Sequence, residues 1–158
     1  MPAALSLEDL STESQRLRSE GRRLVLTNGC FDILHVGHVD YLERARELGD
    51  ALVVALNSDR SVRELKGPSR PVNSEEDRAR VVSALRAVDY VVVFDSLRAT
   101  EVIRALRPAL YAKGGDYTPD SLNAEELAAL HEVGTDIRIL PLVPGRSTTA
   151  ILARAAQP

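Results

Sequence analysis

The sequence predicts an α/β domain built on a parallel, five-stranded sheet with helices on both of its faces. Apolar runs alternate with amphipathic segments five times along the 158 residues, which is the order expected of strands joined by helical crossovers. Runs such as residues 51–56 contain no polar side chain and fit strands that are covered on both faces. Gly49 and Gly134 follow helical segments and are typical helix ends. Together these features predict a single Rossmann-like domain.

The predicted elements are joined by short connections. Ser6 can cap a first helix whose apolar stripe is thin, so residues 1–22 are expected to form a peripheral N-terminal helix before a domain spanning residues 23–158. The strands are predicted at residues 23–27, 51–56, 90–94, 110–112 and 136–140. The remaining helices are predicted at residues 38–48, 57–65, 75–87, 99–106, 124–132 and 150–155.

The composition excludes several classes of protein. A net charge of −3 gives no basic footprint for nucleic acid, and no apolar run approaches the roughly 18 residues that a membrane span needs. The N-terminus lacks a basic segment followed by an apolar one, so no signal peptide is expected. The single cysteine, Cys30, excludes an internal disulfide and a cysteine-based zinc cluster. We therefore expect a cytoplasmic protein with no nucleic-acid or membrane partner.

The segment after the first strand carries the strongest functional signal. Two of the three histidines, His35 and His38, lie at a predicted helix start, whose unpaired N–H groups attract anions. Their imidazoles add donors for charge that builds on a phosphate, and Gly37 has no Cβ to keep a ligand from the backbone. A histidine that merely caps the helix and a metal site are the alternatives, but no third metal ligand is evident. The segment predicts a nucleotide-phosphate site without a protein-held metal.

A second helix start follows the last strand. Residues 146–149 read Arg-Ser-Thr-Thr and lead into the last predicted helix. Ser147 or Thr148 can simply cap that helix. Hydroxyls and free N–H groups at a helix start also bind phosphate oxygens. From the residues alone, both interpretations stay open.

Two further segments carry charge, one after the fourth predicted strand and one in the loop after the helix that follows the second strand. Residues 113–116, Lys-Gly-Gly-Asp, form either an exposed turn or a flat backbone shelf for a base or ribose. Lys66 and Arg70 lie in a loop rich in Gly and Pro, which is either solvated or closes over the substrates. Transfer of a phosphoryl group requires cations around the reacting phosphate. Asp59, after the second strand, either faces the acceptor substrate or caps its helix.

Residues 27–38 contain the pattern T-x-G-x-F-D-x-x-H-x-G-H, which resembles the signature of the nucleotidylyltransferase superfamily. The resemblance implies attack on the α-phosphate of a nucleoside triphosphate, with His35 and His38 as catalytic residues, and we predict Lys66 of the basic loop as the third. The residues it implies for nucleotide binding are Thr27, Asn28, Gly29, Phe31, Asp32, Gly37, Lys113, Gly114, Gly115, Asp116, Arg146, Ser147, Thr148 and Thr149. For acceptor binding we predict Asp59, Arg70 and Arg78. Related enzymes place a phosphate-binding arginine at the position of Arg78, and a surface position on a helix is the alternative for this residue.

From residue 27 to about residue 154 the chain is most similar to the adenylyltransferase branch of the bacterial heptose kinase/adenylyltransferases. The similarity lies in residues 27–32, 57–59, 66–73, 113–118 and 147–149. It implies transfer of AMP, or of GMP, from ATP or GTP to D-glycero-D-manno-heptose 1-phosphate, with Mg²⁺ bound mainly through the triphosphate. A separate heptose kinase is expected to supply this sugar 1-phosphate, because 158 residues leave no room for a kinase domain.

Alternatives to this function remain. Glycerol-3-phosphate cytidylyltransferases and enzymes for flavin-type products are similar, but the former typically show R-T-E-G-I-S-T-T where this chain has L-V-P-G-R-S-T-T. Arg146 stands where an aromatic residue is expected in the heptose branch, so the base is left open. A non-catalytic nucleotide sensor would bind ATP without releasing pyrophosphate, and a structural domain would bind no nucleotide. A homodimer is an expectation from the resemblance alone.

Overall fold

The sheet at the centre of the molecule is parallel throughout. The structure, a computed structural model, describes residues 3–115 and 121–158. The strands follow the order β3-β2-β1-β4-β5 across the sheet, and every neighbouring pair is parallel. This confirms the predicted fold class. The order in which successive strands are added to the sheet reverses between β1 and β4, although all strands point the same way. The strands are β1 (Leu24–Gly29), β2 (Ala51–Asn57), β3 (Tyr90–Phe94), β4 (Leu110–Gly114) and β5 (Asp136–Leu140).

Pairing explains where the strands end. Every residue of β2 is buried, as expected for a strand covered on both faces. β1 runs two residues beyond its predicted end at residue 27, because Asn28 and Gly29 stay in register with Ala55 and Leu56. Because of this extension, the first residues of the segment 27–38 lie at the carboxyl edge of the sheet.

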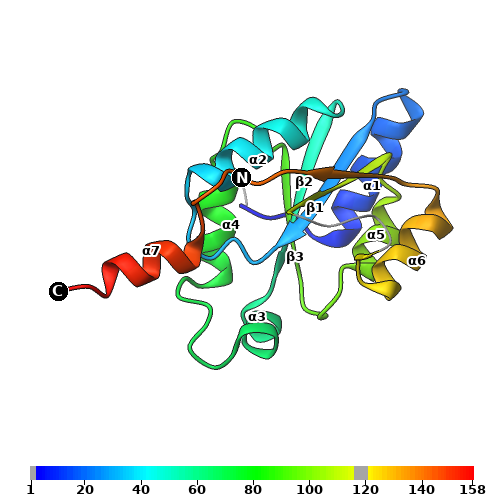
Figure 1. Cartoon of the computed structure of the whole chain (residues 1–158). Helices are drawn as coiled ribbons and strands as arrows, with labels where there is room; N and C mark the ends of the chain where they lie inside the picture. Colours follow the sequence, from blue (N-terminus) through cyan, green and yellow to red (C-terminus); the bar gives the residue numbers. More distant parts are fainter. Residues whose placement is uncertain (1–2, 116–120) are drawn as a thin grey trace.

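Helices cover both faces of the sheet, as Figure 1 shows. α2 and α4 pack on one face, and α1, α5 and α6 pack on the other. α3 follows β2 at the carboxyl edge. α7 has no buried residue and projects away from the rest of the molecule. The helices are α1 (Leu7–Ser19), α2 (Val36–Glu47), α3 (Asp59–Lys66), α4 (Glu75–Ser83), α5 (Thr100–Leu106), α6 (Ala124–Val133) and α7 (Thr148–Ala155).

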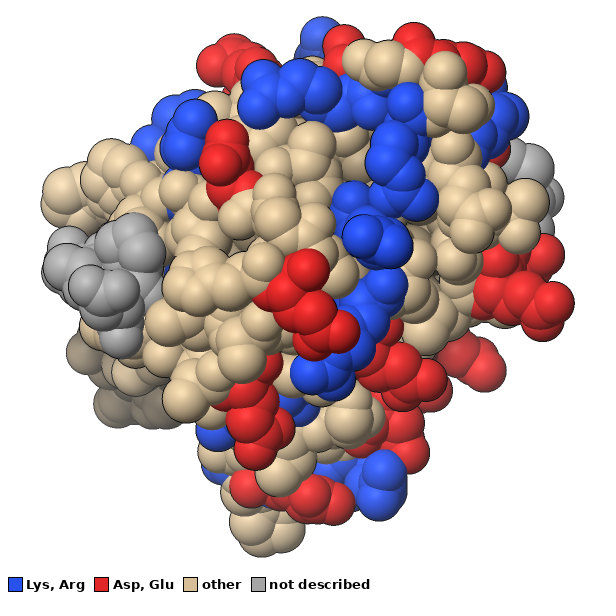
Figure 2. All heavy atoms as spheres, turned by 90° about the vertical axis from the view of Figure 1, so that its right-hand side faces the viewer, with Lys and Arg blue, Asp and Glu red and all other residues tan. Residues whose placement is uncertain are grey.

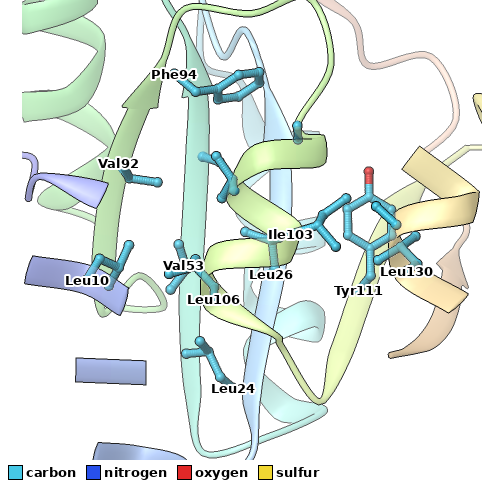
Figure 3. Close-up of a cluster of buried hydrophobic side chains, with 14 of the residues drawn as sticks. Leu10, Leu24, Leu26, Val53, Val92, Phe94, Ile103, Leu106, Tyr111 and Leu130 are labelled. Carbon is cyan, nitrogen blue, oxygen red and sulfur yellow. The ribbon is translucent and has the colours of Figure 1, made fainter. Parts of the chain in front are cut away.

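One of the two apolar clusters extends to the carboxyl edge of the sheet. Figure 3 shows this cluster, in which Leu26 of β1 lies beside Ile103 and Leu106 of α5. Tyr111 of β4 is fully buried in it. The hydroxyl of Tyr111 points toward the end of the cluster where Phe94, the last residue of β3, lies. The hydroxyl of a core residue, Tyr111, thus lies toward the carboxyl edge of the sheet.

The first helix is integrated more deeply than its thin apolar stripe indicates. Ser6 caps α1, as predicted, by accepting a hydrogen bond from the Asp9 N–H. Leu10 and Leu17 are at most 1% exposed and belong to the same cluster as the sheet residues. The hydroxyl of Ser14 donates to the carbonyl oxygen of Leu106 in α5. Because these contacts bury one side of α1, the helix forms part of the layer that covers the sheet.

The surface carries charges of both signs. Figure 2 shows lysine and arginine side chains in a band down one face, with aspartate and glutamate side chains beside it. Ion pairs join neighbouring helices, such as Arg104 of α5 with Glu132 of α6 at 3.0 Å. Within the described ranges, no helix combines the length and the apolar character that crossing a membrane would require.

Candidate active site

A cavity of about 220 Å³ lies at the carboxyl edge of the sheet, next to the ends of β1 and β4. This is the position at which open parallel sheets bind ligands. Tyr41, Leu142 and Cys30 form part of its wall. The cavity therefore brings together segments that are distant in the sequence. The predicted site residues that line it are Asn28, Gly29, Phe31, Asp32, His38, Lys66, Arg70, Lys113, Gly114 and Thr148.

The two histidines cap α2 reciprocally. The Nδ1 atom of His35 accepts a hydrogen bond from the backbone N–H of Gly37 at 3.1 Å, and the Nδ1 atom of His38 accepts one from the backbone N–H of His35 at 3.3 Å. The centroids of their rings lie 3.9 Å apart. Because both Nδ1 atoms accept, the proton of each neutral imidazole lies on Nε2. Each ring therefore has an Nε2–H donor to offer to an anion.

Burial makes both imidazoles prefer the neutral form. Burial lowers the pKa of His35 below its ordinary value of 6.5. Burial, the neighbouring His35 and the charge of Lys66 together lower the pKa of His38 to about 4. Protonation would also convert the Nδ1 acceptors into donors that face backbone N–H groups. Before a nucleotide binds at neutral pH, the histidines thus provide hydrogen-bond donors, and the positive charge at the cavity comes from lysine and arginine.

Gly37 has a packing role that was not predicted. A Cβ atom at this position would lie 2.8 Å from Cε1 of His35 and 3.3 Å from Cβ of Arg146. The missing side chain therefore makes room for the His35 ring and for the Arg146 stem. The predicted approach of a ligand to this backbone stays a prediction.

Phe31 shapes the wall beside His38. Its φ of 47° lies in the left-handed region, which a bulky residue adopts rarely. This backbone places the Phe31 ring 5.3 Å from the His38 ring, centroid to centroid. The same ring would lie 2.9 Å from a Cβ atom at Gly29. The left-handed backbone of Phe31 and the absence of a side chain at Gly29 therefore allow the Phe31 ring to lie against one side of the His38 ring.

Asp32 organises the basic loop. Its carboxylate accepts hydrogen bonds from Nε of Arg70 at 2.8 Å and from the backbone N–H groups of Val72 and Asn73. These hydrogen bonds hold the pKa of Asp32 below its ordinary value, although burial acts in the opposite direction. Both carboxylate oxygens are thus occupied, and Arg70 is fixed to the wall of the cavity. Lys66, at the end of α3, is exposed beside it.

The start of α7 is attached to the loop that carries the histidines. Ser147 caps the helix by accepting from the Ala150 N–H, so the capping alternative holds for its hydroxyl. Thr148 lines the cavity, and its hydroxyl donates to the carbonyl oxygen of Ile33 at 3.0 Å. Arg146 and Thr149 are exposed, and neither lines the cavity. Of the four predicted residues, only Thr148 is therefore placed on the cavity wall.

Thr27 and Gly115 support the site from outside the cavity. The hydroxyl of Thr27 is buried and lies 2.7 Å from the hydroxyl of Tyr41, whose pKa burial raises to about 12. The backbone N–H of Gly115 donates to the carbonyl oxygen of Leu140. Asp116, predicted to bind ribose, lies outside the described residues. Any nucleotide contact of these three residues stays a prediction.

Arg78 is buried, so its predicted surface alternative is wrong. Its side chain is 0% exposed and donates to the carbonyl oxygens of Cys30, Asn57 and Asn73 and to the carboxylate of Asp59. These partners belong to the segments after β1 and β2 and to the segment before α4. Neither Arg78 nor Asp59 lines the cavity. Arg78 therefore joins the loops that build the site, and acceptor binding by this pair stays a prediction.

Three wall residues, Tyr41, Cys30 and Leu142, were not among the predicted site residues. Tyr41 lies three positions after His38 on α2, so the helical period placed it on the same side. Cys30 was predicted to be a packing residue. Burial raises the pKa of its thiol, and its Sγ lies 4.0 Å from Oδ1 of Asn57. A raised pKa disfavours the thiolate that nucleophilic attack requires.

The residues of the cavity do not form a metal cage of their own. Within residues 3–115 and 121–158, no group of three His, Cys, Asp or Glu side chains is arranged to hold a metal ion. Asp32 is the carboxylate on the described wall of the cavity, and hydrogen bonds occupy both of its oxygens. A divalent cation that enters with a triphosphate therefore fits this site through phosphate oxygens and water.

Comparison with known proteins agrees with this geometry. The chain matches the cytidylyltransferase-like family over residues 26–154. It is 53% identical over 137 residues to the bifunctional protein HldE of Syntrophotalea carbinolica, which covers 87% of this chain and 28% of that protein. It is 50% identical over 151 residues to the bifunctional protein HldE of Methylobacillus flagellatus, and this match covers 96% of this chain and 30% of that protein. The chain thus spans about three tenths of the length of these curated relatives.

A solved structure shares the fold. It is the lipopolysaccharide core biosynthesis protein from Thermoplasma volcanium, which matches with a TM-score of 0.63 and 28% sequence identity. The match covers 78% of this chain and 98% of that protein. Nearly the whole of that protein therefore corresponds to the sheet and helices described above.

Proposed function

The chain belongs to the cytidylyltransferase-like family of nucleotidyltransferases, and from this premise we propose that it transfers AMP, or GMP, to D-glycero-D-manno-heptose 1-phosphate. The products would be ADP-heptose or GDP-heptose and pyrophosphate. The observation that carries the proposal is the single cavity into which His38, Lys66 and Thr148 converge from three different elements. Imidazole donors, an ammonium group and a helix start are the groups that bind a triphosphate.

The heptose acceptor is supported by sequence similarity. The chain shares about half of its residues with the HldE proteins over the part that it matches. The segments that resemble the heptose branch include residues 27–32 and 113–118. Residues 28–32 line the cavity, as do Lys113 and Gly114. Segments that resemble the heptose branch therefore form part of the wall of the cavity.

The reaction we propose is a direct in-line displacement. A phosphate oxygen of the acceptor attacks the α-phosphorus, a new P–O bond forms, and the bond to the bridging oxygen of the β-phosphate breaks. Pyrophosphate leaves with that electron pair. The attacking oxygen is already ionised, so no general base is needed. Nε2–H of His38 and the ammonium group of Lys66 would stabilise the charge that develops on the phosphates.

Magnesium would enter with the nucleotide. Mg²⁺ keeps several water ligands and favours substrate phosphates over dedicated protein cages, which suits a cavity whose Asp32 oxygens are already bonded. When bound, the ion would neutralise the charge of the leaving pyrophosphate. The protein residues would orient the triphosphate around it.

The acceptor carries an anomeric phosphate, so a heptose kinase would have to supply it. Nucleoside triphosphate is the second substrate, and we therefore place the reaction in the cytoplasm. These two assignments follow from the chemistry of the proposed substrates.

A substrate panel tests the proposal. Purified protein would be mixed with ATP, GTP or CTP and with heptose 1-phosphates or glycerol 3-phosphate, and pyrophosphate release would be followed. We expect release only with a heptose 1-phosphate, and with ATP or GTP as the donor. Release with CTP and glycerol 3-phosphate would favour the cytidylyltransferase alternative. ATP binding without release in any combination would favour a nucleotide sensor.

A further inference from the structure

A second cavity, of about 280 Å³, adjoins the first. Asn28, Gly29 and Lys113 line both cavities. We propose that the second cavity holds the sugar of the acceptor and that Glu126 is its principal hydroxyl-binding residue. This inference rests on the proposed function, because it assigns a place to the second substrate. The residues of the second cavity that matter here are Leu65, Leu97, Arg98, Leu122, Asn123 and Glu126.

Glu126 is a buried carboxylate that faces this cavity. The residue is 6% exposed, and its Oε1 atom accepts a hydrogen bond from the backbone N–H of Ala99 at 3.0 Å. The described residues give its other oxygen no donor. No buried side-chain polar atom in the described part of the chain lacks a partner, so that oxygen is accessible from the cavity. A carboxylate kept from bulk water binds hydroxyl donors strongly.

Two amide side chains are oriented by their own contacts. Oδ1 of Asn123 accepts hydrogen bonds from the N–H groups of Glu125 and Glu126, which leaves its Nδ2 as a donor. Oδ1 of Asn28 accepts from the hydroxyl of Tyr111 at 2.5 Å, which likewise leaves Nδ2. The cavity thus offers one carboxylate oxygen and two amide donors. This mixture suits the hydroxyl groups of a sugar, each of which both donates and accepts.

The remaining wall suits the ring of a sugar. Leu65, Leu97 and Leu122 provide apolar surface against which the C–H groups of a pyranose can pack. Arg98 is exposed at the rim, where its guanidinium group can reach the polar end of the ligand. Apolar walls with a few placed polar groups are typical of small-molecule sites.

The shared residues explain how the substrates would meet. A triphosphate in the first cavity and a sugar in the second would both have their phosphates near Gly29 and Lys113. A phosphate on the anomeric carbon would then lie next to the α-phosphorus. Direct displacement requires this proximity of the two reacting groups.

The variant Glu126→Gln tests the inference. Glutamine keeps an oxygen that accepts from the Ala99 N–H, so the fold should be retained, and it replaces the second carboxylate oxygen by an amide donor. Glu125→Gln, an exposed neighbour on the same turn, is the matched control. We expect the KM for heptose 1-phosphate to rise at least about tenfold in Glu126→Gln, which corresponds to the loss of a hydrogen bond to a charged group. The KM for ATP should stay within about twofold.

Calorimetry separates this inference from the proposed function. Heptose 1-phosphate would be titrated into wild type and both variants, with a non-hydrolysable ATP analogue present. Binding to wild type and to Glu125→Gln, weakened in Glu126→Gln, would support the sugar site even if turnover is absent. The inference would be overturned if Glu126→Gln turned over substrate and bound heptose 1-phosphate as wild type does, or if it lost affinity for ATP instead. It would also be overturned if wild type did not bind heptose 1-phosphate.

Discussion

The Nδ1 atom of His38 accepts a hydrogen bond from the backbone N–H of His35, and the two imidazole rings lie 3.9 Å apart. Each histidine is thereby fixed by backbone of its own turn. The reciprocal capping turns Nε2–H of both rings into the available donors. Of the two, His38 lines the cavity and His35 does not, so His38 is the histidine whose donor the cavity presents directly.

His38→Ala should remain folded and lose at least about 100-fold in turnover, the usual consequence of removing one donor to a developing charge. The third histidine, the exposed His131 of α6, is the matched control, and His131→Ala should keep wild-type turnover. Pyrophosphate release measures the rate, and circular dichroism checks the fold. A loss of less than about threefold would remove His38 from the mechanism.

The stability of the protein should decrease as the pH falls from about 6.5 toward about 4. The folded pKa of His38 is about 4 and its ordinary value is 6.5, so the unfolded chain binds more protons in this window and protonation favours unfolding. The free energy of unfolding from urea titrations at several pH values measures this slope. His38→Gln should show a smaller slope between these pH values. An equal slope in the two proteins would contradict the neutral, buried state of His38.

Arg78→Ala should destabilise the fold by about 3–5 kcal/mol, the range for breaking a buried ion pair. The variant leaves the carbonyl oxygens of Cys30, Asn57 and Asn73 without this donor and leaves Asp59 without its cation. Urea unfolding at neutral pH measures the loss. Arg80→Ala, at an exposed position of the same helix, should change the free energy of unfolding by less than about 0.5 kcal/mol. If Arg78→Ala lowered the free energy of unfolding no more than is expected for Arg80→Ala, the network around Arg78 would contribute little to stability.

The order of strands and helices could be predicted because it depends on local patterns. β3 and β5 occupy the predicted residues: aspartates flank the apolar run of β3, and Gly134 and Pro141 lie close to the two ends of β5. The start of α2 was predicted at residue 38 but lies at Val36. The reason is that a histidine caps it, whereas serine, threonine, asparagine or aspartate usually mark such a start.

Burial of charged residues depends on tertiary contacts, so the sequence predicted it poorly. Arg78 precedes Ala79 and Val82 on α4, but its burial requires three loops to present carbonyl oxygens to it. Glu126 had a clearer signal. Ala129 and Leu130 follow it at the spacing of one helix face, and all three are buried. A carboxylate on an apolar face could have marked the second cavity before the structure did.

The most direct test of the account is the stoichiometry of the complete reaction. ATP or GTP, Mg²⁺ and D-glycero-D-manno-heptose 1-phosphate would be incubated with the protein, and sugar nucleotide and pyrophosphate would be quantified together by mass spectrometry and a coupled assay. We expect one pyrophosphate for each nucleotide-activated heptose, and no pyrophosphate when the sugar 1-phosphate is omitted. Pyrophosphate without sugar nucleotide, or neither product while the triphosphate binds, would contradict it.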